Sequence, residues 1–78
     1  MFKVGDTVRL GMYQVTVAIV RLIEVSEDTA TGVSILPKVH SLYSAHTPFP
    51  NWPFRTMTKL TPEEVVAAQL GAYDGEFG

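Results

Sequence analysis

Residues 13–25, YQVTVAIVRLIEV, contain the longest apolar run of the chain and decide the predicted fold. β-Branched side chains favour strands, because a helix restricts their rotation about χ1. In an extended chain, Val15, Val17 and Ile19 fall on one face, while Ala18 and Val20 fall on the other. Both faces are therefore partly apolar. We predict a long strand that bends sharply and contributes to both sides of a curled sheet.

The segments around this strand continue a strand-rich pattern. Within residues 2–10 we predict a strand preceded by a turn, with the bend at Gly5-Asp6. We also predict a hairpin loop over 26–32, a return strand over 32–43, a loop over 44–53 and a final strand over 54–60. Gly32 ends the hairpin loop because glycine tolerates positive φ. Pro37 cannot donate a ladder hydrogen bond, so the return strand is expected at a sheet edge or broken by a bulge.

A helix over residues 62–70 has the strongest local signals. Thr61 is a good N-cap, Pro62 suits the first helical position, Glu64 completes a capping box, and Gly71 offers a stop. The fold class is thus mainly β with one short C-terminal helix, as a strongly bent antiparallel sheet or small barrel.

The composition indicates one small domain over residues 1–78, with the barrel in 1–60 and an acidic tail over 72–78. Residues 1–60 hold six Lys and Arg against four acidic residues, whereas 61–78 hold four acidic residues and no basic one. The absence of cysteine excludes disulfides and thiolate metal sites. The apolar run is too short to cross a bilayer and no signal peptide is recognisable, so we expect a cytoplasmic protein with no membrane association.

The opening segment carries a resemblance to a known family. Val4, Gly5, Asp6 and Val8 form a Val-Gly-Asp-x-Val pattern that resembles the SH3-like small barrels, including the KOW type of ribosomal and transcription-associated proteins. The resemblance implies a barrel over residues 1–60. Only Gly11 stands where that type has a glycine-spaced turn, so no nucleic-acid-binding residue is carried over.

The sequence contains no pattern typical of catalysis or of metal binding. His40 and His46 have no acidic residue near them, since none occurs between residues 29 and 62. Ser34, Ser41 and Ser44 lie near His40 in sequence but form no nucleophile motif. We therefore predict a non-enzymatic protein without catalytic residues, metal or cofactor.

The segment 40–54, HSLYSAHTPFPNWPF, is the candidate partner-binding site because it combines both histidines, the tryptophan and three prolines. Aromatic and arginine side chains dominate binding hot spots. The predicted partner-binding residues are Tyr43, His46, Phe49, Trp52 and Arg55. Tyr43, His46 and Phe49 are expected at the surface, while a core position is favoured for Trp52 and Phe54.

The favoured function is a protein–protein interaction module. Small acidic domains of this composition are common among phage and mobile-element accessory proteins, which suggests inhibition of a host enzyme or defence complex by occlusion. A nucleic-acid-binding module of KOW type is the alternative, using Arg9, Arg21, Lys38 and Arg55. A homodimer formed through a sheet edge and a structural subunit of a larger assembly also remain open.

Overall fold

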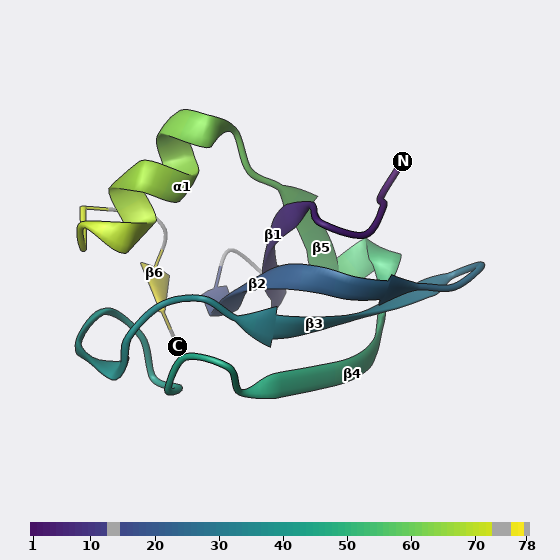
Figure 1. The fold of residues 1–78 in the computed structure, drawn as a ribbon, viewed down its shortest axis with the longest axis horizontal. Coiled ribbons are helices and arrows are strands. Elements are labelled where there is room, and N and C mark those ends of the chain that lie inside the picture. Colours follow the sequence, from purple (N-terminus) through teal and green to yellow (C-terminus); the bar gives the residue numbers. More distant parts are fainter. Residues whose placement is uncertain (13–14, 73–75, 78) are drawn as a thin grey trace.

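The fold is a curled sheet with one short helix (Figure 1). The computed structural model describes residues 1–12, 15–72 and 76–77. Its elements are β1 (Thr7–Met12), β2 (Val15–Val25), β3 (Thr29–Ser34), the 3-10 helix η1 (Lys38–His40), β4 (Pro48–Pro53), the 3-10 helix η2 (Phe54–Thr56), β5 (Met57–Lys59), α1 (Pro62–Gln69) and β6 (Glu76–Phe77). The prediction of a mainly β protein with one short C-terminal helix is confirmed.

Five strands form an antiparallel sheet in the order β4-β3-β2-β1-β5. β4 and β5 are the edge strands, yet η2 joins them with only three residues. In a flat sheet, four spacings of about 4.8 Å would separate these edges by about 19 Å. Three residues of 3-10 helix rise only about 6 Å. The sheet therefore has to curl until its two edges approach each other at η2.

β2 bends because it contains two irregularities. Its register with β1 slips between Ala18 and Thr16, and its register with β3 slips between Leu22 and Glu24, so Val17 and Ile23 are extra residues. Bulges of this kind bend a strand and increase its twist. They explain how one strand serves both sides of the sheet, as the sequence predicts.

The two faces of β2 bury different clusters. The concave core holds Val8, Leu10, Ala18, Val20, Leu22, Ala30, Phe49 and Met57. Ile19 points the other way, where α1 covers it through Ala68, together with Leu36 and Leu60. The helix is therefore held by a second, smaller apolar cluster on the outer face of the sheet.

Both ends of α1 follow the predicted signals. The Thr61 hydroxyl accepts a hydrogen bond from the Glu64 N–H at 3.2 Å, and the Glu64 carboxylate accepts one from the Thr61 N–H at 2.9 Å. At the other end, Gly71 adopts φ +76° and donates to the Ala68 carbonyl, while Ala72 donates to Ala67. This pairing is a Schellman ending, which requires a left-handed residue and so favours glycine.

The first strand begins at Thr7, after the turn that the sequence predicts. Other predicted boundaries are wrong, since Gly32 lies inside β3, opposite Leu22, instead of ending a loop. A Cβ atom added at Gly32 would stand 2.6 Å from Val20 Cγ2, so this glycine is needed for close strand packing. The return strand ends at Ser34, and Pro37 precedes η1 outside any strand.

The largest error concerns the proline-rich segment, which was predicted as a loop. Residues 48–53 form β4, paired with β3 from Thr29 to Val33. Prolines are tolerated there because β4 is an edge strand, where one row of backbone groups needs no partner. Asn51 takes a left-handed conformation, φ 54°, where the register with β3 slips.

The predicted acidic tail is described only in part. β6 pairs in parallel with Val15 and Thr16 of β2. It lies on the same side of β2 as β3, whose own pairing with β2 ends at Ser34. Residues 73–75 and 78 lie outside the described part. Within the described residues, no helix has the length and apolar character needed to span a membrane.

Candidate functional site

Three aromatic residues of the candidate site form an edge-to-face cluster centred on Phe49. The Tyr43 and Phe49 rings are 5.1 Å apart at 90°, and the Phe49 and Trp52 rings are 5.9 Å apart at 71°. Phe49 stands opposite Gly32 in β3 and is only 7% exposed. The expectation that Phe49 is accessible is therefore wrong, because pairing of β4 with β3 turns its ring into the concave core. Tyr43 remains 38% exposed.

Trp52 and Phe54 pack against the concave core, as favoured from the sequence. Both are partly buried, and Phe54 also contacts Phe2, with ring centroids 5.2 Å apart. The aromatic segment thus contributes mainly to the core, and Tyr43 is its most peripheral ring.

His46 is exposed on a turn that a buried serine holds in place. The His46 N–H donates to the Ser34 carbonyl at 2.7 Å, and the Thr47 N–H donates to the Ser34 hydroxyl at 2.9 Å. The Ser34 hydroxyl in turn donates to the Ser44 carbonyl at 2.5 Å. His46 itself has a positive φ of 67°. Ser34 is therefore a structural residue that positions the loop between Tyr43 and β4.

The predicted partner-binding residues do not form a single patch. Tyr43 and His46 precede β4, whereas Arg55 lies in η2, which follows it. These residues therefore lie at opposite ends of the strand.

The basic residues of the nucleic-acid alternative are divided in the same way. Lys38 follows β3 and Arg55 follows β4, and these strands are antiparallel, so the two residues lie at opposite ends of the pair. Arg9 and Arg21 are diagonal neighbours on one face, since Arg9 pairs with Ile19 and Arg21 pairs with Thr7. The half-buried Arg9 is held by a 2.6 Å hydrogen bond from its Nε to the Thr16 hydroxyl.

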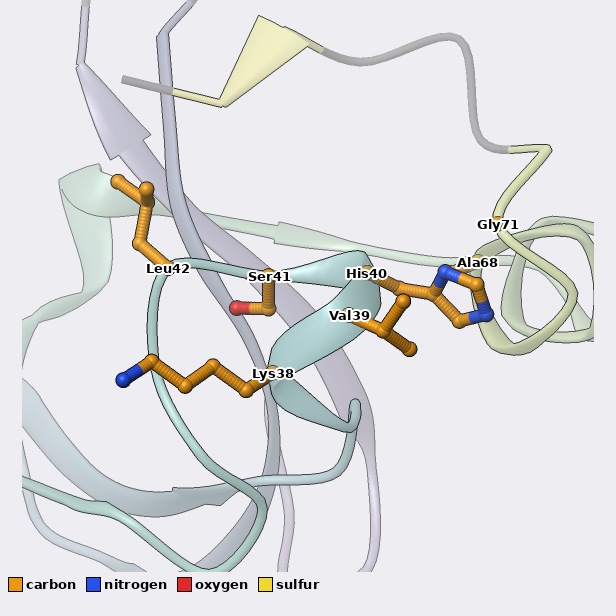
Figure 2. Close-up of a pocket in the computed structure, with 7 residues that line it drawn as sticks. All are labelled: Lys38, Val39, His40, Ser41, Leu42, Ala68 and Gly71. Carbon is orange, nitrogen blue, oxygen red and sulfur yellow. The ribbon is translucent and has the colours of Figure 1, made fainter.

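The described residues enclose a pocket where the segment 38–42 meets the end of α1 (Figure 2). Its volume is about 330 Å³, and Ala68 and Gly71 complete its lining. The His40 ring is directed at the helix end, where a Cβ atom on Gly71 would stand 2.7 Å from its Cε1 atom. Glycine at position 71 therefore serves both the helix ending and the contact with His40.

Large aliphatic side chains stand exposed around this pocket. Val39 is 81% exposed and Leu42 is 55% exposed, and both line it. Single exposed aliphatic residues are common, but two of them lining one pocket are typical of a binding surface.

The sequence pattern predicts residues 38–43 as part of a strand and so does not indicate this site. Pro37 was the available signal: it cannot donate a ladder hydrogen bond, and here it is the N-cap of η1, with φ −68°. The buried Leu36 anchors the chain just before this departure. The contact with α1 is a tertiary feature that no local pattern predicts.

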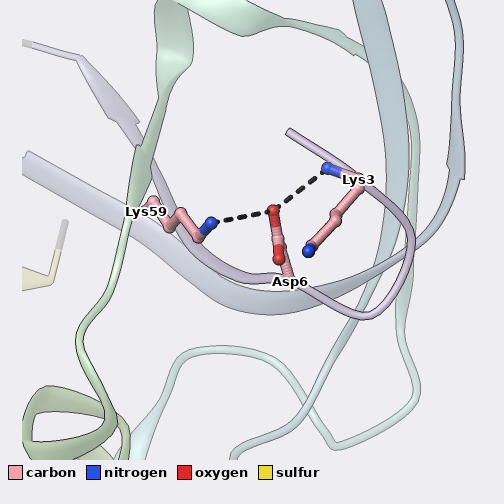
Figure 3. Close-up of polar contacts among 3 residues, drawn as sticks. All are labelled: Lys3, Asp6 and Lys59. Carbon is pink, nitrogen blue, oxygen red and sulfur yellow. Dashed lines mark hydrogen bonds and ion pairs between the residues drawn. The ribbon is translucent and has the colours of Figure 1, made fainter. Parts of the chain in front are cut away.

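The charged contacts elsewhere serve the fold. The Asp6 carboxylate accepts a hydrogen bond from the Lys3 N–H at 3.0 Å and lies 3.5 Å from the Lys59 ammonium (Figure 3). Burial by itself would raise the pKa of Asp6, but the Lys3 hydrogen bond and the Lys59 charge outweigh it and lower that pKa below its ordinary value of 3.8. These contacts tie the N-terminal turn to β5.

In the part of the chain that the structure describes, no three His, Cys, Asp or Glu side chains gather in an arrangement that could hold a metal ion. Comparison of the chain with protein-family models, with curated proteins and with solved structures finds no significant match.

Proposed function

We propose that this protein is a non-enzymatic protein-interaction module that docks through the η1–α1 surface, defined as Val39, Leu42 and the pocket that they line. The observation that carries the proposal is the exposure of these two aliphatic side chains, each more than half accessible, at a pocket of about 330 Å³. Complete burial of one such side chain contributes about 1.5–3 kcal/mol. A partner that covers both therefore has a substantial apolar driving force.

The segment that forms the surface is anchored at both ends by buried contacts, which favours binding. The segment that presents Val39 and Leu42 is anchored by the buried Leu36 on one side and by the Ser34 hydrogen bonds on the other. A surface that is ordered before association loses less conformational entropy on binding.

The proposed mechanism is steric occlusion of the partner. An SH3-like barrel is part of this proposal and is supported by the curled five-strand sheet that η2 closes. Inhibition of a host enzyme or defence complex by a phage-type accessory protein also belongs to the proposal, on the basis of composition alone.

The experiment compares two matched variants in an affinity pull-down from lysate of the native host. Val39→Ser removes an aliphatic group from the η1–α1 surface, whereas Val4→Ser makes the same change at an exposed valine (62%) in the N-terminal turn. We expect a defined protein to be retained by the wild type and by Val4→Ser after nuclease treatment. Its retention by Val39→Ser should fall about tenfold, since that variant loses most of the burial of one valine.

Two results would overturn the proposal. Equal retention by Val39→Ser and Val4→Ser would show that the η1–α1 surface is not the docking site. Loss of every partner after nuclease treatment would favour the nucleic-acid alternative. In that case Arg9→Glu and Arg21→Glu should abolish binding, and binding should weaken steeply as salt is raised.

A further inference from the structure

The pocket of the η1–α1 surface is lined by aliphatic side chains and, on one side, by the positively charged Lys38. Figure 2 shows the Lys38 and Leu42 side chains on one side of the 38–42 segment, with the Ser41 hydroxyl between them, while His40 and Val39 are directed toward α1. Lys38 is exposed. The Ser41 hydroxyl accepts from the Tyr43 N–H at 3.3 Å. Within the described residues this hydroxyl donates to no protein atom, so its proton is available to an acceptor.

We propose that this pocket binds an acidic-aliphatic peptide segment of the partner, in which an Asp or Glu is followed two residues later by Leu, Ile or Val, since these positions share one face of an extended peptide. The peptide carboxylate pairs with the Lys38 ammonium and accepts a hydrogen bond from Ser41. The aliphatic side chain enters the pocket against Val39 and Ala68. This inference rests on the proposed function and names the chemical class of its partner.

The charges around the pocket favour an acidic ligand on the Lys38 side. Among the described residues, no carboxylate lines the pocket, and no ion pair involves Lys38. The acidic residues of α1, Glu63 and Glu64, lie in its first turn, whereas the pocket borders its last turn.

The helix also determines the orientation of the ligand. The C-terminal end of α1 carries the negative pole of the helix dipole and has no basic residue in its last turn. A carboxylate is therefore disfavoured beside Gly71 and favoured beside Lys38, which leaves the aliphatic side chain on the Ala68 side. The volume, about 330 Å³, is at the lower end of the roughly 300–1,000 Å³ range of ligand pockets. It suits one or two side chains of an extended peptide.

The experiment titrates the full-length ¹⁵N-labelled protein with three blocked peptides and follows its amide resonances. The probes are Gly-Asp-Leu-Leu-Gly, its isosteric Asn analogue and its Lys analogue, each acetylated and amidated so that no terminal charge contributes. We expect the Asp peptide to shift the amides of residues 38–42, Ala68 and Gly71. It should bind about fivefold more tightly than the Asn peptide, which is equivalent to about 1 kcal/mol for an exposed ion pair.

A charge exchange makes the test specific. Lys38→Glu should reverse the preference, so that the Lys peptide binds this variant more tightly than the Asp peptide does. Arg55→Glu is the matched control, because it changes the net charge equally at the opposite end of the β3–β4 pair. It should leave the preference for the Asp peptide unchanged.

The outcomes separate this inference from the proposed function. If all three peptides shift the pocket amides with equal affinity, the acidic specificity is wrong, while docking through the aliphatic surface stands. If Arg55→Glu weakens the Asp peptide as much as Lys38→Glu does, the attraction is a general charge effect and the inference is overturned. If no peptide shifts these amides even at millimolar concentration, the pocket is not a peptide site and the inference fails.

Discussion

Replacement of Gly71 by alanine tests how the end of α1 meets η1. Gly71 has φ +76°, and an added Cβ atom would stand 2.7 Å from Cε1 and 2.8 Å from Nδ1 of His40. The left-handed conformation costs a non-glycine residue about 1–2 kcal/mol. Displacement of a packed ring adds about 1–3 kcal/mol, as in other overpacked sites. We expect Gly71→Ala to lower the free energy of unfolding by about 2–5 kcal/mol.

Gly5→Ala is the matched control. Gly5 also has a positive φ, +95°, but no atom lies within 4 Å of its added Cβ. It should therefore lose only the conformational part, about 1–2 kcal/mol as at Gly71. The assay is equilibrium urea denaturation followed by fluorescence of Trp52, the single tryptophan, which packs against the concave core. A 78-residue domain has about 4–12 kcal/mol in total, so a loss of about 1–2 kcal/mol is a measurable fraction, whereas a loss of about 5 kcal/mol would unfold a protein at the lower end of this range.

A double-mutant cycle isolates the contact with the ring. His40→Ala removes the obstacle, so Gly71→Ala should cost at least about 1 kcal/mol less in the His40→Ala background than in the wild type. The reasoning is refuted if the cycle shows no coupling and Gly71→Ala costs the same as Gly5→Ala. The His40 ring would then not lie against the helix end in solution, and the pocket would lose one of its walls.

Three further predictions concern the core and the N-terminal turn. Ser34→Ala should lower the free energy of unfolding by about 1–3 kcal/mol, because it removes the buried hydroxyl that accepts from the Thr47 N–H and donates to the Ser44 carbonyl, and it should speed hydrogen exchange in residues 44–47. Gly32→Ala should cost about 1–3 kcal/mol through the clash with Val20, measured by urea denaturation, and an unchanged midpoint would contradict the close packing of β2 and β3. The folded-state pKa of Asp6 is lowered, so its ionised form contributes stability that is complete above its ordinary pKa of 3.8 and is lost as pH falls through the folded value. Denaturation at about pH 6 and about pH 3 should therefore show a larger loss in the wild type than in Asp6→Asn, and equal losses would rule out this contribution.

The sequence predicted those features that depend on neighbouring residues. The capping box of Thr61 and Glu64 and the stop at Gly71 lie within one helix, so its bounds differ from the prediction by only one residue. The β-branched run likewise indicated β2 and its two apolar faces, because side-chain alternation is a local property.

The errors in the strands arose where pairing outweighed local preference. Three prolines predict a loop, but β4 is an edge strand, and its pairing with β3 buries Phe49 opposite Gly32. A glycine after a polar segment predicts a turn at Gly32. In the structure this position instead needs a residue without a side chain, because Val20 of the neighbouring strand packs against it. Neither fact can be read without the register of the sheet.

The candidate surface shows the same division. The sequence by itself determined a mainly β chain with a capped helix, since hydrophobic periodicity and caps act over a few residues. Only the tertiary structure decided that His40 meets Gly71 and that Val39 and Leu42 stand exposed beside α1. The physical reason is that these residues lie about thirty positions apart in the chain. They meet only because α1 packs on the outer face of β2, and that packing depends on the arrangement of the whole sheet.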